Sequence, residues 1–195
     1  MIPIIPLAGN IYRHSYWSNA FDSLQLEDIM AYCETKDEDA KVTTQNSKET
    51  GDCFRTATVT YLEHTEEARF FIEALVGIVR SLNSKIYNFD ITGVFERLQY
   101  SVYNVGDHYE TWHQDAENPT EEMAPRKISL SLQLSRPEDY EGGELQMGGV
   151  RDMQVASKEF GSITLFPSFL PHCITPVTKG IRKSIVMWTS GPTFR

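Results

Sequence analysis

The chain has little basic charge, no long apolar run and few cysteines. Each of these shortages argues against a class of protein. The formal net charge of −9 argues against a surface that follows nucleic-acid phosphates, although a local basic patch stays compatible with it. No apolar run approaches the roughly 20 residues that span a bilayer, so we expect no membrane contact. The 3 cysteines, Cys33, Cys53 and Cys173, are widely spaced and form neither a disulfide framework nor a CxxC metal site.

The first ten residues contain prolines and no basic region, so they are not expected to be a signal peptide. Together with the isolated cysteines, this predicts a cytoplasmic protein. A length of 195 residues suits one domain with a substantial core. We expect a single domain over 1–195, with helical support at about 21–95 and a strand-rich core at about 96–191.

The first half is predicted to be mixed. Residues 22–34 indicate a helix capped by Asp22 or Ser23, and residues 56–62 alternate like a strand. Residues 35–52 are polar and are interpreted as a solvated loop, with a mobile lid over a site as the alternative. A second helix should follow Thr65. Its apolar positions form one stripe: Phe71, Leu75, Ile78, Val79 and Leu82.

The second half is predicted to be strand-rich, because short β-type runs alternate with glycine and proline turns. The runs are 97–103, 109–115, 127–134, 144–147, 153–157, 162–166, 172–176 and 183–189. Eight short strands with frequent turns favour a sandwich or jelly-roll barrel. The predicted class is therefore α+β, mainly β, with N-terminal helices supporting a jelly roll.

Several of these strands have one polar and one apolar face, since side chains at i and i+2 share a face. Residues 127–134 alternate between serine or glutamine and large aliphatic side chains, and residues 97–103 and 182–188 show similar patterns. The polar faces would point to water in an ordinary antiparallel sheet. The alternative is a polar cavity inside the barrel, and the pair His113 and Asp115, placed on one strand face, favours this second arrangement.

His113, Asp115 and the distant His172 form a candidate metal site. Two imidazoles and one carboxylate suit Fe(II) with open coordination positions, and Zn²⁺ would accept the same set. Arg182, ten residues after His172, offers a planar fork for a carboxylate. Ser184 shares its strand face, and Tyr103 is a further hydrogen-bond donor for the same anion.

With these residues the chain resembles the Fe(II)/2-oxoglutarate-dependent dioxygenases, and within them the prolyl 4-hydroxylase-like, PKHD-type branch of bacteria and their phages. The resemblance runs from about Phe21 to the C-terminus. The segments that carry it are 98–100, 106–109, 112–115, 126–130, 139–145, 166–172, 175–177, 180–184 and Trp188.

The resemblance implies a double-stranded β-helix in which His113, Asp115 and His172 are catalytic and hold Fe(II). It also implies that Arg182 binds the distal carboxylate of 2-oxoglutarate, helped by Tyr103 and Ser184. Matching positions along the co-substrate pocket are Ser129 and Trp188. The family reaction uses O₂ and converts 2-oxoglutarate to succinate and CO₂ while hydroxylating a substrate, and ascorbate is a compatible accessory reductant.

Two departures from the family pattern stand out. Arg182 replaces the lysine of animal prolyl hydroxylases, which preserves a carboxylate-binding cation. The spacing from Tyr109 to His113 is one residue longer than expected and suggests a bulge.

The substrate is the least determined feature. The main hypothesis is a prolyl residue in a protein or peptide, with Tyr109, Trp112 and Arg126 as candidate contacts. The loops at 35–52 and 116–126 border a groove or are simply solvated. The alternatives are the same chemistry on a free amino acid or other small molecule, nucleic-acid demethylation, which the acidic balance disfavours, and a non-catalytic or Zn²⁺-bound jelly-roll binding module.

Overall fold

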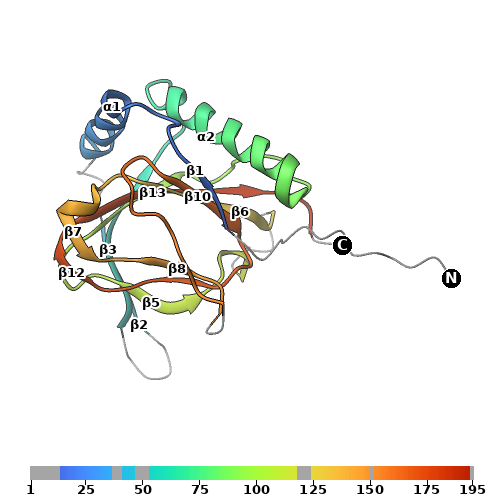
Figure 1. Ribbon diagram of the computed structural model, residues 1–195. Helices are drawn as coiled ribbons and strands as arrows, with labels where there is room; N and C mark the ends of the chain where they lie inside the picture. The colour runs from blue at the N-terminus through green and yellow to red at the C-terminus, as the bar shows by residue number, and fades with distance from the viewer. Residues whose placement is uncertain (1–13, 37–40, 47–52, 118–123, 150–151, 194–195) are drawn as a thin grey trace.

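The structure is a computed structural model that describes residues 14–36, 41–46, 53–117, 124–149 and 152–193. A large antiparallel sheet lies under two helices, and a smaller sheet lies on its other side (Figure 1). The seven strands of the large sheet are β1 (Ser15–Trp17), β2 (Lys41–Asn46), β3 (Cys53–Leu62), β4 (Leu98–Tyr103), β6 (Arg126–Gln133), β10 (Ile163–Pro167) and β13 (Arg182–Ser190). Their order across the sheet is β1-β10-β6-β13-β4-β3-β2.

The smaller sheet completes the jelly roll. Its four strands are β5 (Tyr109–His113), β8 (Leu145–Met147), β9 (Gln154–Val155) and β11 (His172–Ile174), in the order β5-β11-β8-β9. A separate ribbon pairs β7 (Tyr140–Gly142) with β12 (Val177–Gly180). Two opposed antiparallel sheets with helices on one side confirm the predicted class, mainly β within α+β.

The first helix, α1 (Ser23–Glu34), begins as its sequence predicts. Asp22 is the N-cap: its side chain accepts a hydrogen bond from the Gln25 N–H at 2.9 Å, and the Gln25 side chain accepts one from the Asp22 N–H at 3.0 Å. This reciprocal pair is a capping box.

The second helix, α2 (Arg69–Leu82), begins later than expected. Ala68 is the N-cap, although the Thr65 hydroxyl still accepts a hydrogen bond from the Ala68 N–H at 3.3 Å. The predicted apolar stripe is confirmed, because all five of its side chains are buried. A π-helical turn, η2 (Asn83–Tyr87), follows α2, and two short 3-10 helices lie at η3 (Asp115–Glu117) and η4 (Pro137–Asp139).

The large sheet explains why its strands alternate. Aliphatic side chains such as Leu130, Leu132 and Ile185 are fully buried in the core that includes residues of α1 and α2. Each such burial contributes about 1.5–3 kcal/mol. The opposite face is polar yet also buried: Ser129 is 0% exposed and Ser184 1%. The polar faces therefore point into the barrel, and the cavity alternative is confirmed.

Four strands were not predicted, namely β1, β2, β7 and β12. The interpretation of 35–52 as a loop is wrong for β2, which pairs with β3. Residues 37–40 and 47–52 lie outside the described ranges, so the lid alternative stays untested. The β7–β12 ribbon depends on glycine: at Gly142, φ is 72° and a Cβ atom would lie 2.1 Å from the Pro176 carbonyl oxygen. None of the helices within the described ranges has the length and apolar character of a bilayer span.

Candidate metal and co-substrate site

The three candidate metal ligands converge from separate segments. His113 ends β5 and is the register partner of His172, the first residue of β11. Asp115 begins η3 just after β5, so the expectation that it shares a strand face with His113 is wrong, and the turn itself brings its carboxylate back. One ligand atom from each of the three side chains lies within 4.8 Å of the others.

Both histidines are oriented for ligation by the same device. Nδ1 of His113 bonds to the Thr111 carbonyl oxygen at 2.9 Å, and Nδ1 of His172 bonds to the Leu170 carbonyl oxygen at 3.0 Å. As a donor to a carbonyl, each Nδ1 carries the proton, and Nε2 keeps its lone pair. Nε2 of His172 lies 3.6 Å from an Asp115 carboxylate oxygen. This orientation of metal-binding histidines by backbone carbonyls is common in metalloproteins.

The environment keeps Asp115 charged. Burial by itself raises the pKa of this carboxyl, but the electrostatic influence of the adjacent His172 and hydrogen bonding by Ser129 and the Trp188 indole outweigh burial and lower the pKa. The Ser129 hydroxyl donates to Oδ2 at 2.6 Å and also lies 3.0 Å from the Ser168 hydroxyl. A carboxylate held in this way is ready to accept a cation.

His113 is kept neutral. Burial, and the repulsion that two protonated imidazoles would experience at this distance from His172, lower the pKa of His113 to about 4. The Tyr109 ring stacks on the imidazole, with 3.7 Å between ring centroids. Neutral imidazole is the form that ligates metals, so near pH 7 this side chain needs no deprotonation before it binds.

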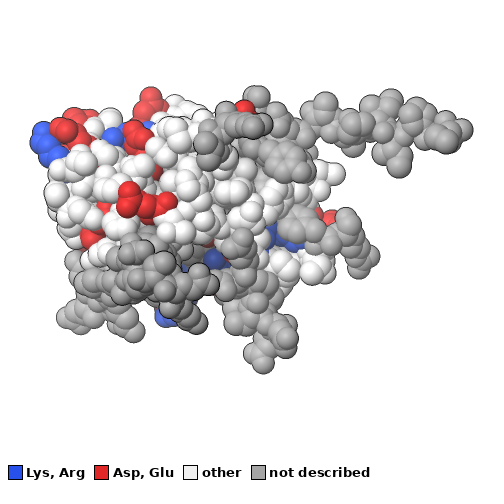
Figure 2. All heavy atoms as spheres, turned by 90° about the horizontal axis from the view of Figure 1, so that it is seen from below, with Lys and Arg blue, Asp and Glu red and all other residues white. Residues whose placement is uncertain are grey.

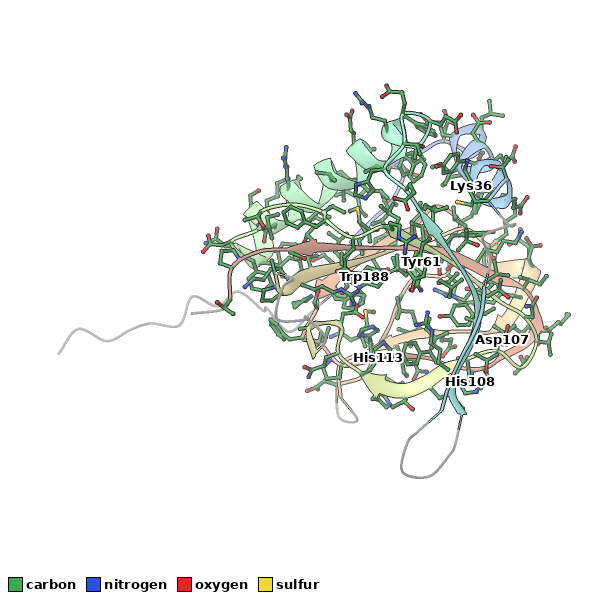
Figure 3. All side chains as sticks on the ribbon, turned by 180° about the vertical axis from the view of Figure 1, so that it is seen from behind. Lys36, Tyr61, Asp107, His108, His113 and Trp188 are labelled. Atoms are coloured by element: carbon green, nitrogen blue, oxygen red, sulfur yellow. The ribbon has the colours of Figure 1, made fainter. Side chains whose placement is uncertain are left out.

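The triad borders a cavity of about 320 Å³. Trp188 on the large sheet and His113 on β5 lie across the space between the two sheets (Figure 3). Polar side chains of β4 and β13 line this cavity, including Gln99, Tyr103 and Ser184. The Trp188 Nε1 atom is buried near the Asp115 carboxylate, whose pKa it helps to lower, and it makes no close hydrogen bond within the described residues.

Arg182 lies beside the cavity, deep in the barrel, and is 3% exposed. It lines a small void that shares Ser131 and Leu145 with the main cavity. Its guanidinium donates to the Ser184 hydroxyl at 3.1 Å. No carboxylate of the described residues forms an ion pair with it. A buried cation without a counter-ion is costly, so the site fits an anionic guest.

Two buried phenols accompany Arg182. Burial raises the pKa of Tyr103 and, separately, that of Tyr140. Tyr103 is the register partner of Arg182, whose guanidinium carbon lies 5.6 Å from the centre of the phenol ring. The Tyr140 hydroxyl accepts a hydrogen bond from Gln133 at 3.0 Å. Both phenols stay protonated at neutral pH and are donors for a carboxylate.

The three candidate substrate contacts lie in different environments. Tyr109 lines the cavity, whereas Trp112 is 39% exposed and is not among its lining residues. Arg126 lines the cavity but is already engaged by Glu96. The register between β5 and β11 shifts between His113 and Tyr109, as the unusual spacing predicts.

Two other charged residues, Arg55 and Glu96, also line the cavity, and neither was predicted from the sequence. Arg55 lies over the Tyr109 ring, with 4.9 Å between the guanidinium carbon and the ring centre. Its parity with the buried Ala57 and Val59 on β3 was an available signal. No local sequence pattern pointed to Glu96, because its partner Arg126 lies 30 positions away in the sequence.

Comparison with known proteins agrees with a metal site beside an anion pocket. Residues 98–190 match the family model of the 2OG-Fe(II) oxygenase superfamily. A PKHD-type hydroxylase of Synechococcus sp. (strain CC9902) is 39% identical over 84 residues, which are 43% of this chain and 36% of that protein. PKHD-type hydroxylase YbiX of Escherichia coli O1:K1 / APEC is 41% identical over 61 residues, 31% of this chain and 27% of that protein. The chain thus matches well under half the length of these curated relatives.

Solved structures share the fold over nearly the whole chain. A Pseudomonas putida prolyl-4-hydroxylase superposes with a TM-score of 0.67 at 18% identity, covering 92% of this chain and 93% of that one. A prolyl hydroxylase from Trichoplax adhaerens, in complex with a hypoxia inducible factor peptide fragment, gives 0.71 at 17% identity, covering 91% and 83%. A carbocyclase of nogalamycin biosynthesis gives 0.72 at 11% identity, covering 96% and 84%.

Fold and site together define a jelly-roll protein with a facial metal triad beside an anion pocket. Residues 98–190, which include all three residues of the triad, are similar to the 2OG-Fe(II) oxygenase superfamily. The residues fit the two groups in that name: the ligand set of two imidazoles and one carboxylate suits Fe(II), and the buried Arg182 suits a carboxylate of 2-oxoglutarate.

Proposed function

We propose that this protein is a Fe(II)- and 2-oxoglutarate-dependent hydroxylase that acts on prolyl residues of a protein or peptide. The observation that carries the proposal is the placement of His113, Asp115 and His172 beside a cavity whose neighbouring void holds the buried Arg182. An ion held by the triad and a dicarboxylate held by Arg182 would lie in adjoining spaces that share Ser131 and Leu145.

The triad would hold Fe(II), which, when bound, activates O₂ for substrate hydroxylation coupled to the conversion of 2-oxoglutarate to succinate and CO₂. Arg182 would bind the distal carboxylate of 2-oxoglutarate, with Tyr103 and Ser184 donating further hydrogen bonds. Because these groups are buried and fixed by neighbouring strands, they orient the co-substrate without reorganisation. Trp188 lines the cavity, whereas Ser129 lies behind it and acts through its hydrogen bond to Asp115. Ascorbate is a compatible accessory reductant.

The proposed prolyl substrate is supported by the prolyl hydroxylases among the solved structures of this fold and by the cavity lining. Tyr109 offers an aromatic face beside the metal site, on which a proline ring would pack. Bacterial relatives also support a bacterial or phage-encoded protein acting in the cytoplasm. A nucleic-acid substrate is disfavoured: on the described part of the face shown in Figure 2, Lys and Arg form separate spots and no continuous band.

A matched peptide assay tests the function. The Fe(II)-loaded protein, supplied with 2-oxoglutarate and ascorbate, is incubated with a library of proline-containing peptides and with the same peptides carrying alanine for proline. The proposal predicts succinate formation together with a gain of one oxygen atom, about 16 Da, on proline-containing members only. Turnover with free amino acids and none with peptides would move the function to small-molecule hydroxylation. Metal binding without any succinate would indicate a non-catalytic or Zn²⁺-bound module.

A further inference from the structure

Arg126 is held in place from two directions. It begins β6, and its Nε donates to a Glu96 carboxylate oxygen at 2.6 Å while its Nη2 pairs with the other oxygen. The guanidinium lies over the Trp188 ring, with 3.9 Å from its carbon to the ring centre. Both side chains of the ion pair are mostly buried, at 22% exposed for Arg126 and 17% for Glu96. A planar fork stacked on an aromatic ring has little freedom.

The remaining arm of this guanidinium faces the metal site. Nη1 of Arg126 lies 4.0 Å from Oδ1 of Asp115. The other carboxylate oxygen of Asp115, Oδ2, takes the hydrogen bond from Ser129. Oδ2 is therefore held by a hydrogen bond, while Oδ1 faces the arginine charge at a distance too long for a direct hydrogen bond. The hydrogen bond at one oxygen and the attraction of the cation at the other favour the same orientation of the carboxylate.

Glu96 neutralises the charge of Arg126 beside the metal site. A lone arginine beside a metal ligand would repel the incoming cation and weaken the carboxylate as a donor. The two-point contact between Glu96 and Arg126 makes the pair neutral as a unit. Arg126 can then orient Asp115 without adding a net positive charge to the site.

We propose that Arg126 is a positioning residue for the metal ligand Asp115, with Glu96 as its counter-ion, and that it is not primarily a substrate contact. The inference rests on the proposed function, since it assigns a role at the same site. It replaces the expectation that Arg126 touches substrate. Groups that orient metal ligands in this way commonly change metal affinity by about 10- to 100-fold when they are removed.

The test measures metal affinity without turnover. Co²⁺ is titrated into the metal-free protein, without 2-oxoglutarate, and the Kd is compared among the wild type, Arg126→Met, Glu96→Gln and the double variant. Arg97→Met is the matched control, because Arg97 also pairs with a glutamate, Glu63, at 3.4 Å and lies over a ring, that of Tyr61, at 4.8 Å, yet makes no contact with Asp115. Thermal unfolding of each metal-free variant confirms that it is folded.

We expect the Kd for Co²⁺ to rise at least about tenfold in Arg126→Met and in the double variant. Glu96→Gln should also bind Co²⁺ more weakly, since it leaves the arginine charge uncompensated, whereas Arg97→Met should match the wild type. If Arg126→Met does not fold, Glu96→Gln and the double variant decide the question. Unchanged Co²⁺ affinity in the folded variants, together with a raised KM for substrate in Arg126→Met, would overturn the inference and restore the substrate role.

The result is separable from the fate of the proposed function. A wild type that binds no Co²⁺ contradicts the metal site and this inference together. A wild type that binds Co²⁺ but never converts 2-oxoglutarate contradicts the hydroxylase alone, and the role of Arg126 is still decided by the metal affinities.

Discussion

Replacing Arg182 with methionine should separate co-substrate binding from metal binding. The guanidinium is 3% exposed, donates to Ser184 and has no carboxylate partner among the described residues. Truncating one member of a buried, hydrogen-bonded charge pair costs about 2–5 kcal/mol. Because the hydroxyls of Tyr103 and Ser184 remain as donors, we take about 3 kcal/mol, which corresponds to roughly a hundredfold weaker 2-oxoglutarate binding.

The assay is an anaerobic titration of the Fe(II)-loaded protein with 2-oxoglutarate and with 2-oxopentanoate, which has the same chain length but lacks the distal carboxylate. The wild type should prefer 2-oxoglutarate strongly, and Arg182→Met should bind the two ligands about equally. Arg136→Met is the control, because Arg136 is a half-exposed arginine paired with Glu27 away from the cavity. A selectivity in Arg182→Met that equals that of the wild type would refute the assignment of the anion pocket.

Three further outcomes are expected. The metal-free protein should lose stability as pH falls from about 6.5 to about 4, because the pKa of His113 is about 4 in the folded state and about 6.5 in the unfolded chain. The urea midpoint of unfolding should therefore depend less steeply on pH in His113→Asn than in the wild type. An identical pH dependence in the two proteins would contradict this. Ile185→Ala, at a fully buried position on the helix-facing side of the sheet, should lower the free energy of unfolding by about 2–5 kcal/mol in urea denaturation, with 2-oxoglutarate affinity of the folded protein unchanged. Tyr109→Leu should raise the KM for a peptide substrate more than Trp112→Leu, since only Tyr109 lines the cavity; equal effects would argue against packing of substrate on Tyr109.

Much of the barrel was predictable because its strands obey a strict alternation. In β6, serines and glutamine alternate with leucines, and both sets are buried, one in the cavity wall and one in the core. The choice between water and cavity for the polar set could not be made from alternation alone. It depended on the presence of a second sheet, which adds the partners that enclose Ser129 and Ser131.

The missed features arise from tertiary pairing. β2 has a polar, threonine-rich sequence typical of a loop, and it is a strand because β3 is beside it. The contact between Glu96 and Arg126 joins residues from different elements and has no local pattern. Asp115 lies beside the two histidines as expected, but the 3-10 turn η3, and not the strand, orients its carboxylate.

The proposed hydroxylase activity is tested most directly by an anaerobic titration of the Fe(II)-loaded protein with 2-oxoglutarate, followed by admission of O₂ and an assay for succinate. We expect a visible metal-to-ligand charge-transfer band that appears on titration and is absent in Asp115→Ala, and then succinate from the wild type alone. A correctly metallated wild type that gives neither the band nor succinate would contradict the hydroxylase.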